Sequence, residues 1–357
     1  PSEDPSTWGD FRFENPTDSW LLIESWADGV NVVVVIYGPD LGWQVETKGP
    51  QPGAKFQVLR DQELVDPELE PGTIKLTTLP SIGEEFGHYR VVRDRDGNLL
   101  WERRFDFSED IYGHASSLVL HPELLYVQID LGKPDIGKSH MVALDRATGE
   151  TVWEIPRPVQ GSWTTPIVIE AGGREELITS AKPWVIAYDP ATGEEYWRVR
   201  CIEGDSAPSP IFANGRIYVA NIYAELTAIL PGGSGDMTET HVDWSVRGQF
   251  PDITSPLSDG DLVWTLHTSG VLSCFDAQTG AEQYAERLPS RFRASPSLVG
   301  DRVYLIGEAG ESFVISAGRQ FEQVGGGGFG ESIYATPSFA HGRMYVRGTG
   351  RVFCVGD

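Results

Sequence analysis

The chain has 357 residues, of which 52 are acidic and 28 are lysine or arginine, so its formal net charge is −24. Such a chain offers no basic face to phosphate groups, and we therefore do not expect a nucleic-acid partner. No apolar run approaches the ~18 residues of a membrane span. The 40 glycines, 11 tryptophans and 12 tyrosines favour many short strands and tight turns, which predicts an all-β fold.

Residues 1–108 predict a small β domain without internal repeats. Apolar stretches at residues 20–23 and 32–37 lie on either side of an Asp28-Gly29 turn. Residues 89–98 predict a hairpin with a second turn at Asp96-Gly97. Asp-Gly between two apolar stretches is a strong hairpin signal, because glycine accepts the positive φ that tight turns need.

This N-terminal segment resembles the C-terminal β module of VanW-type cell-envelope proteins. The likeness lies in Asn-Pro-Thr at residues 15–17, Ile-Tyr-Gly at residues 36–38 and Tyr-Arg-Val-Val at residues 89–92. The resemblance implies a protein of the cell envelope. It implies no activity, because the glycine-rich, cysteine-containing core of that family is absent from this sequence.

The rest of the chain carries a short mark six times. The mark is a small or hydroxyl residue, then serine or threonine, usually followed by proline and an apolar residue. Successive copies are 40 to 49 residues apart and stand at residues 115–118, 164–167, 208–211, 254–257, 294–297 and 335–338. A period of ~40–50 residues is typical of the blades of a β-propeller.

Each repeat predicts four strands with a fixed turn before the last. The third strand ends in Asp-x-x-Thr-Gly, where the carboxylate accepts backbone N–H groups and glycine supplies positive φ. The fourth strand carries an aromatic that we expect to fill the gap between neighbouring blades. The structural motif residues are Asp145, Thr148, Gly149, Trp153, Asp189, Thr192, Gly193, Trp197, Asp276, Thr279 and Gly280, with Trp244 and Tyr284 at the aromatic position of two further repeats.

The clearest copies, residues 144–153 and 188–197, resemble the PQQ-like repeat of a β-propeller family. The resemblance covers residues 109–357 and implies about six four-stranded blades, with the small β domain in front of them. Two repeats lack the turn and have Gly232-Gly233-Ser234-Gly235-Asp236 and Ser316-Ala317-Gly318 instead. The last repeat ends early and lacks an outer strand.

Residues 89–107 fit two interpretations. In one, Trp101 packs within a hairpin of the small domain. In the other, residues 99–105 lend an outer strand that closes the propeller, because a ring must close or leave exposed edges. A ribbon that does both is compatible with the sequence, which leaves the question open.

Three glycine-rich segments match site expressions that their context contradicts. Residues 132–139 fit the P-loop expression, but a strand follows instead of the helix that would aim N–H groups at phosphate. Residues 325–330 fit G-x-G-x-x-G, and we expect a flexible loop between blades. Residues 232–238 hold too few acidic ligands for calcium, and we expect a loop that bonds to itself.

The fold and the surface charge favour a non-catalytic binding or scaffold protein of the cell envelope, located outside the cytoplasm. We expect protein partners and neither catalytic residues, cofactor nor metal. A structural subunit of a surface assembly or filament, which would self-associate, is an alternative. A PQQ-dependent dehydrogenase is disfavoured, because Cys201, Cys274 and Cys354 are far apart, whereas those enzymes are similar in repeat but have adjacent cysteines and eight blades.

A small-ligand site is conceivable where the repeats meet at the axis. The candidates are the residues just before the six marks, because they enter the innermost strand of each blade. This candidate axial pocket consists of His114, Trp163, Asp205, Asp252, Arg293 and Tyr334. The alternative is that these side chains pack the mouth of the channel without binding anything.

Overall fold

A computed structural model describes residues 115–340 and 342–356. Within residues 1–114 it describes the strand segments given below, with the side chains of residues 101–103 and 105. The chain divides into two compact units. The first contains residues 1–114, 122–124 and 144–152, and the second contains residues 115–121, 125–143 and 153–357.

The first unit contains two antiparallel sheets. One has the order β2-β1-β6-β7, built from β1 (Leu21–Ala27), β2 (Val32–Tyr37), β6 (Gly87–Arg93) and β7 (Leu99–Asp106); the other joins β3 (Trp43–Gln44), β4 (Val58–Arg60) and β5 (Glu63–Val65). Both expected hairpins are confirmed, since β1 pairs with β2 and β6 pairs with β7. The domain boundary at residue 108 stays a prediction.

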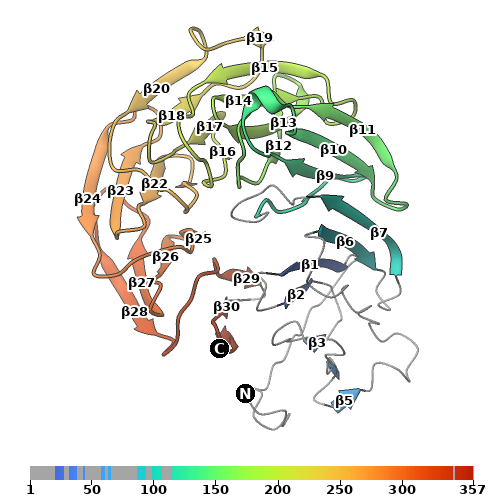
Figure 1. Cartoon of the computed structure of the whole chain (residues 1–357). Helices are drawn as coiled ribbons and strands as arrows, with labels where there is room; N and C mark the ends of the chain where they lie inside the picture. Colours follow the sequence, from blue (N-terminus) through green and yellow to red (C-terminus); the bar gives the residue numbers. More distant parts are fainter. Residues whose placement is uncertain are drawn as a thin grey trace. The chain divides into compact units, whose positions relative to one another are not determined.

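Six sheets follow the six sequence marks, which confirms the predicted propeller class. Figure 1 shows them in chain order along an arc from β9 to β30. Blade one contains β8 (Val119–Leu120), β9 (Leu124–Ile129), β10 (His140–Asp145) and β11 (Thr151–Pro156), and blade two contains β12 (Ile167–Ala171), β13 (Arg174–Ala181), β14 (Trp184–Tyr188) and β15 (Glu195–Arg200). Blade three contains β16 (Ile211–Ala213), β17 (Arg216–Val219), β18 (Leu226–Ile229) and β20 (Val242–Val246), and blade four contains β21 (Leu257–Ser258), β22 (Leu262–Leu266), β23 (Val271–Asp276) and β24 (Glu282–Arg287). Blade five contains β25 (Ser297–Val299), β26 (Arg302–Ile306), β27 (Glu311–Ser316) and β28 (Gln323–Gly328), and blade six contains β29 (Ser338–Ala340), β30 (Arg343–Arg347) and β31 (Val352–Val355).

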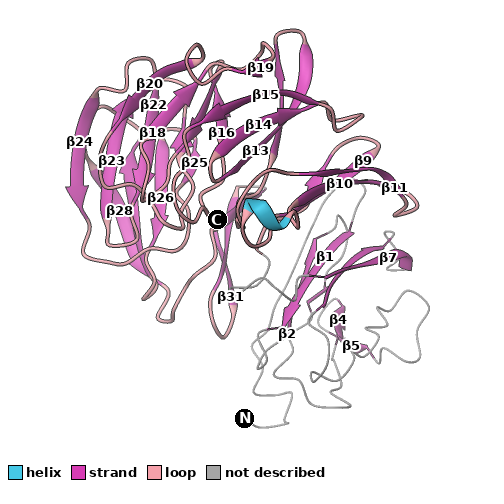
Figure 2. Ribbon diagram, turned by 45° about the horizontal axis from the view of Figure 1, so that its top comes forward, coloured by secondary structure: helices cyan, strands magenta, loops and turns pink. Residues whose placement is uncertain are grey.

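The core lies between the sheets, because each four-stranded sheet has two apolar faces and cannot bury both alone. One buried cluster joins Trp197 of blade two to Ile217 of blade three. Another joins Trp264 of blade four to Val303 of blade five. Figure 2 shows the blades stacked face to face. Burial of these neighbouring faces is what makes consecutive repeats stack.

Two expectations about glycine-rich segments need correction. The segment at 325–330 is not simply a flexible loop, because Gly325 to Gly328 form most of β28 and pair with β27. Residues 232–238 do not only bond to themselves, since β19 (Gly235–Asp236) pairs in parallel with β15 of blade two. Glycine has no side chain to signal strand alternation, so the pairing of its backbone is invisible in the sequence pattern.

The segment that fits the P-loop expression contains one turn of 3₁₀ helix, η2 (Pro134–Ile136), followed by β10. Its backbone turns at Gly137, where φ is +64°. No α-helix begins here to present N–H groups to a phosphate. The interpretation as a long connection between two strands is therefore confirmed.

Candidate functional site

The Asp-x-x-Thr-Gly turn is a rigid hydrogen-bonded unit. In blade one, the Asp145 carboxylate accepts the Thr148 N–H at 2.8 Å and the Thr148 hydroxyl at 2.9 Å. The Gly149 N–H donates to the Asp145 carbonyl at 2.8 Å. The two bonds from Thr148 to the carboxylate lower the pKa of Asp145, the bond from the Thr148 side chain most of all. These bonds therefore hold the turn in one shape, and Gly149 leaves space beside the turn because it has no side chain.

The glycine of such a turn and the residue after its aspartate contact a tryptophan from the outer strand of the preceding blade. The Trp153 indole N–H donates to the Pro190 carbonyl at 3.0 Å, and its ring lies 2.8 Å from where a Cβ on Gly193 would stand. The same contact recurs for Trp244 on Ala277 and Gly280. At these two junctions the tryptophan of one blade lies against the turn of the next blade, and a common role for all the motif residues stays a prediction.

The first unit contains the same contact. The Trp101 indole N–H of β7 donates to the Arg146 carbonyl at 2.8 Å, and its ring covers Gly149. Arg103 adds a 2.8 Å hydrogen bond to the Thr151 hydroxyl. Trp101 thus belongs to a hairpin and also docks on the turn of blade one, while its strand pairs with β6.

Trp197 faces a blade that lacks the turn, and its partner differs. Its indole N–H donates to the buried Glu176 carboxylate at 2.9 Å. Glu176 also accepts Arg174 at 2.9 Å and the Gly232 N–H at 3.4 Å. The insertion of residues 231–241 covers this edge through β19, and Met237 N–H donates to the Arg198 carbonyl at 2.8 Å. At this junction the buried Glu176 carboxylate and residues 231–241, which we call the strap, take the place of the turn.

The repeated serine or threonine of the mark links the innermost strands. In each case the backbone N–H of one mark donates to the side-chain hydroxyl of the next. The five bonds, at 2.9–3.0 Å, run from Ser117 to Thr165, Thr165 to Ser209, Ser209 to Ser255, Ser255 to Ser295 and Ser295 to Thr336. The mark is therefore a chain of hydrogen bonds from blade one to blade six.

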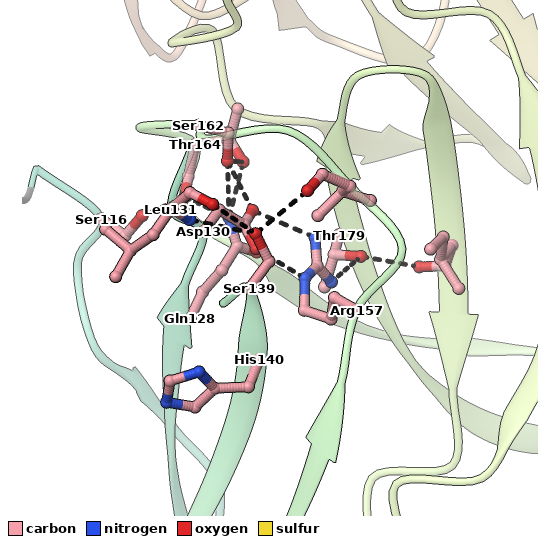
Figure 3. A network of polar contacts seen from close by, with 12 residues as sticks. Ser116, Gln128, Asp130, Leu131, Ser139, His140, Arg157, Ser162, Thr164 and Thr179 are labelled. Carbon is pink, nitrogen blue, oxygen red and sulfur yellow. Dashed lines mark hydrogen bonds and ion pairs between the residues drawn. The ribbon is translucent and has the colours of Figure 1, made fainter. Parts of the chain in front are cut away.

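A polar network is buried between blades one and two (Figure 3). The Arg157 guanidinium and the Asp130 carboxylate are 2.7 Å apart, and both side chains are 0% exposed. Arg157 also donates to the Thr179 hydroxyl of blade two, and Ser162 donates to Asp130 at 2.6 Å. Sequence reasoning missed this network, because Asp130 and Arg157 sit in separate connections with no shared motif.

On one face of the propeller, the connections between strands are linked by hydrogen bonds. Because consecutive strands are antiparallel, the connection between the second and third strands lies on the same face as the connection to the next blade. We call this the loop face, with connections such as 130–139, 220–225, 247–256, 288–296, 307–310, 329–337 and 348–351. Its backbone bonds include Phe292 N–H to the Thr268 carbonyl at 3.0 Å.

The candidate axial residues that the structure describes all lie in connections of the loop face, and two of them touch. The Arg293 guanidinium lies 5.3 Å from the centre of the Tyr334 ring. Asp205 accepts the Gln160 side chain at 2.8 Å, Asp252 accepts the Thr268 hydroxyl, and Trp163 N–H donates to the Ser206 carbonyl at 2.9 Å. His114 lies outside the described residues. A pocket shared by all six stays a prediction.

The loop face also exposes apolar side chains that no blade covers. The most exposed is Tyr223, at 69%, whose ring rests against Gly204 of the neighbouring connection. The others on this face are Ile136, Ile222, Ile253 and Tyr334. Exposed aromatics beside apolar groups are common at protein–protein interfaces.

The described residues offer little to other kinds of site. Among them, histidine, cysteine and acidic side chains nowhere gather in a group of three that could hold a metal. The three cysteines are free, and burial raises the pKa of the Cys201 thiol to about 12. In the same part of the chain, no helix has the length and apolar character to cross a membrane.

Solved structures place the chain among known propellers. BamB from Moraxella catarrhalis is 14% identical, with a TM-score of 0.60 over 96% of this chain and 94% of that one. Sqt1 from Saccharomyces cerevisiae is 13% identical, with a TM-score of 0.55 over 75% and 78%. Raptor from Chaetomium thermophilum is 14% identical, with a TM-score of 0.52 over 68% and 24%. At these identities the likeness establishes the fold alone.

Sequence comparison identifies the family. No curated protein matches the chain. The sequence model of the PQQ_2 family, described as outer membrane protein assembly factor BamB, matches residues 137–252 and 238–321. Those residues span more than half of the chain and contain the three Asp-x-x-Thr-Gly turns and four of the six marks. The chain therefore belongs to the PQQ_2 family of β-propeller repeats.

Proposed function

We propose that the chain is a non-catalytic scaffold that binds proteins of the cell envelope, outside the cytoplasm, through its loop face. The observation that carries the proposal is the set of exposed apolar side chains on this face, with Tyr223 and Tyr334 among them. Tyrosine supplies a large contact area at low entropic cost and suits an interface. Loops on a rigid scaffold are where binding surfaces usually lie.

Two likenesses agree with an envelope role. The family is described as outer membrane protein assembly factor BamB, and we extend to this chain only the general part of that role, binding to other proteins. The resemblance of residues 1–108 to a VanW-type module points to the same compartment. The non-catalytic part of the proposal rests on the absence of a catalytic motif and of adjacent cysteines in the sequence.

Substitutions on the two faces test the proposal. Full-length chain would be immobilised and exposed to a detergent extract of the cell envelope, with the bound proteins identified by mass spectrometry. Tyr223→Ser combined with Ile253→Ser should abolish capture of the specific partner. The matched control is Val299→Ser, at an exposed apolar position at the end of β25, beside the turn to β26 on the opposite face. Equal capture by all three proteins would exclude the loop face.

A structural subunit of a surface assembly is a second candidate, favoured by β28. All six residues of this outer strand are exposed, and an uncovered strand edge can pair with another chain. Size-exclusion chromatography with light scattering across a dilution series separates the two candidates. A polymer that resists dilution would favour the assembly, and a monomer at every concentration would exclude it.

A further inference from the structure

Four connections of the loop face are fixed side by side on blades four to six. Glu308 N–H donates to the Arg291 carbonyl at 2.7 Å, and Ile333 N–H donates to the Glu308 carbonyl at 3.1 Å. Thr349 N–H then donates to the Ser332 carbonyl at 3.0 Å. These bonds join connections 288–296, 307–310, 329–337 and 348–351. The backbone positions from which their side chains project are therefore fixed relative to one another.

Three arginines project from these connections above two recessed glutamates. Arg291, Arg293 and Arg351 are 69%, 48% and 63% exposed. Glu308, which faces Arg291 and Arg293, is 24% exposed, and Glu331, which faces Arg351, is 14% exposed. The surface that a partner meets is therefore cationic, although the chain as a whole carries a formal charge of −24.

The guanidinium donors remain available. Each arginine approaches its glutamate through Nε at 3.5 Å, which is longer than a good charge-assisted hydrogen bond. Glu308 Oε2 and Glu331 Oε1 correspondingly have no hydrogen-bond partner among the described residues. The glutamates hold the arginines in place without using up the fork of donors that recognises carboxylates in pairs.

We propose that Arg291, Arg293 and Arg351, together with the Tyr334 ring, bind an acidic segment of a protein partner. Arginine pairs with carboxylates in bidentate geometry, and the Arg293 guanidinium lies 5.3 Å from the centre of the Tyr334 ring, within the range of a cation–π contact. The exposed ring beside the arginines provides contact area for an apolar residue within the acidic segment. This inference rests on the proposed function, because it names the chemistry of the partner at the same face.

A peptide is favoured over larger polyanions by the range of the charges. Exposed charges are screened beyond ~8 Å at physiological salt, so a short segment meets mainly the three arginines. A membrane or a nucleic acid would extend over the acidic remainder of the chain and be repelled. The arginines therefore select a local acidic stretch.

Fluorescence anisotropy with the full chain tests the inference. The probe is a labelled nine-residue peptide with four glutamates around one phenylalanine, compared with the same peptide carrying glutamines. We expect the acidic peptide alone to bind, and Arg291→Gln with Arg293→Gln to weaken it at least about tenfold, as for loss of charge-assisted bonds. The matched control is Arg302→Gln, because Arg302 is 56% exposed on the opposite face of the same blade. Circular dichroism confirms that each variant is folded.

The remaining outcomes each decide against the inference. Equal binding of the glutamine peptide would show that the arginines do not matter, and so would an unchanged affinity in the double variant. Displacement of the peptide by inorganic phosphate at equal concentration would indicate a general anion site instead. If capture from the envelope extract depends on Tyr223 but the acidic peptide does not bind, the proposed function stands and only this inference fails.

Discussion

Blade two meets its two neighbours with different chemistry. Toward blade one, its Asp-x-x-Thr-Gly turn receives Trp153, and the Asp130–Arg157 pair lies inside the junction. Toward blade three, which has no such turn, Trp197 bonds to the buried Glu176, and a strap closes over β15. The indole N–H of the tryptophan needs an acceptor at each of the two junctions, because burying this group without an acceptor costs free energy. A backbone carbonyl of the turn is thus one acceptor for this N–H, and a buried carboxylate is the other.

The largest expected effect concerns the ion pair between blades one and two. Arg157→Met removes the partner of a carboxylate that is 0% exposed, so the free energy of unfolding should fall by ~3–5 kcal/mol. The control is Arg198→Met, whose partly exposed partner Glu195 can be solvated, so its cost should stay within ~1 kcal/mol. Denaturant titration measures both. Equal costs would mean that water reaches Asp130.

The two tryptophan contacts can be compared directly by replacing each with phenylalanine. Trp197→Phe leaves the buried Glu176 without its indole donor, which should cost ~1–3 kcal/mol. Trp153→Phe removes one of two donors from the Pro190 carbonyl, which still accepts the Tyr126 hydroxyl, and we expect a cost of ~0.5–1.5 kcal/mol. Denaturant titration of both variants gives the order. A larger cost at Trp153 would contradict the view that Glu176 replaces the turn.

The turn itself is tested at its glycine. Gly193 has φ of +76°, and a Cβ there would stand 2.8 Å from the Trp153 ring. Gly215 has nearly the same φ, +77°, with nothing within 4 Å of its Cβ position. Gly215→Ala thus reports backbone strain alone, about 1 kcal/mol. Gly193→Ala should cost a further ~1 kcal/mol or more through the tryptophan, measured as the difference in unfolding free energy.

The sequence predicts these junctions unequally, for a physical reason. Asp189, Thr192 and Gly193 lie within five residues and bond to one another, so their pattern is visible in the chain. Glu176 and Trp197 come from different strands, and nothing local marks either as a partner of the other. The same holds for Asp130 and Arg157. β28 escaped prediction because a run of glycines has no side chains to alternate between two faces.

The candidate site shows the same division. Arg293 and Tyr334 were predictable as residues at the mouth of the propeller, because both precede a repeated mark. Glu308 and Arg351 were not, since each lies in a connection between the second and third strands, which carries no repeated pattern. Their meeting depends on how the loops bond to one another, and that is a property of the folded ring.

The smallest expected effect is a difference between two copies of the turn in how their aspartates make stability depend on pH. Arg319 of blade five, and then Thr279, lower the pKa of Asp276 to about 2; Asp145 forms the same turn bonds, with Thr148 as the main cause of its lowered pKa. A carboxyl whose folded pKa lies below the unfolded value of ~3.9 stabilises the fold fully above that value. This contribution is lost as the pH falls from about 4 toward 2. Asp276→Asn should therefore flatten the acid side of a stability profile more than Asp145→Asn does. If Arg319→Gln leaves the profile of the parent chain unchanged, the bond between blades does not cause the shift.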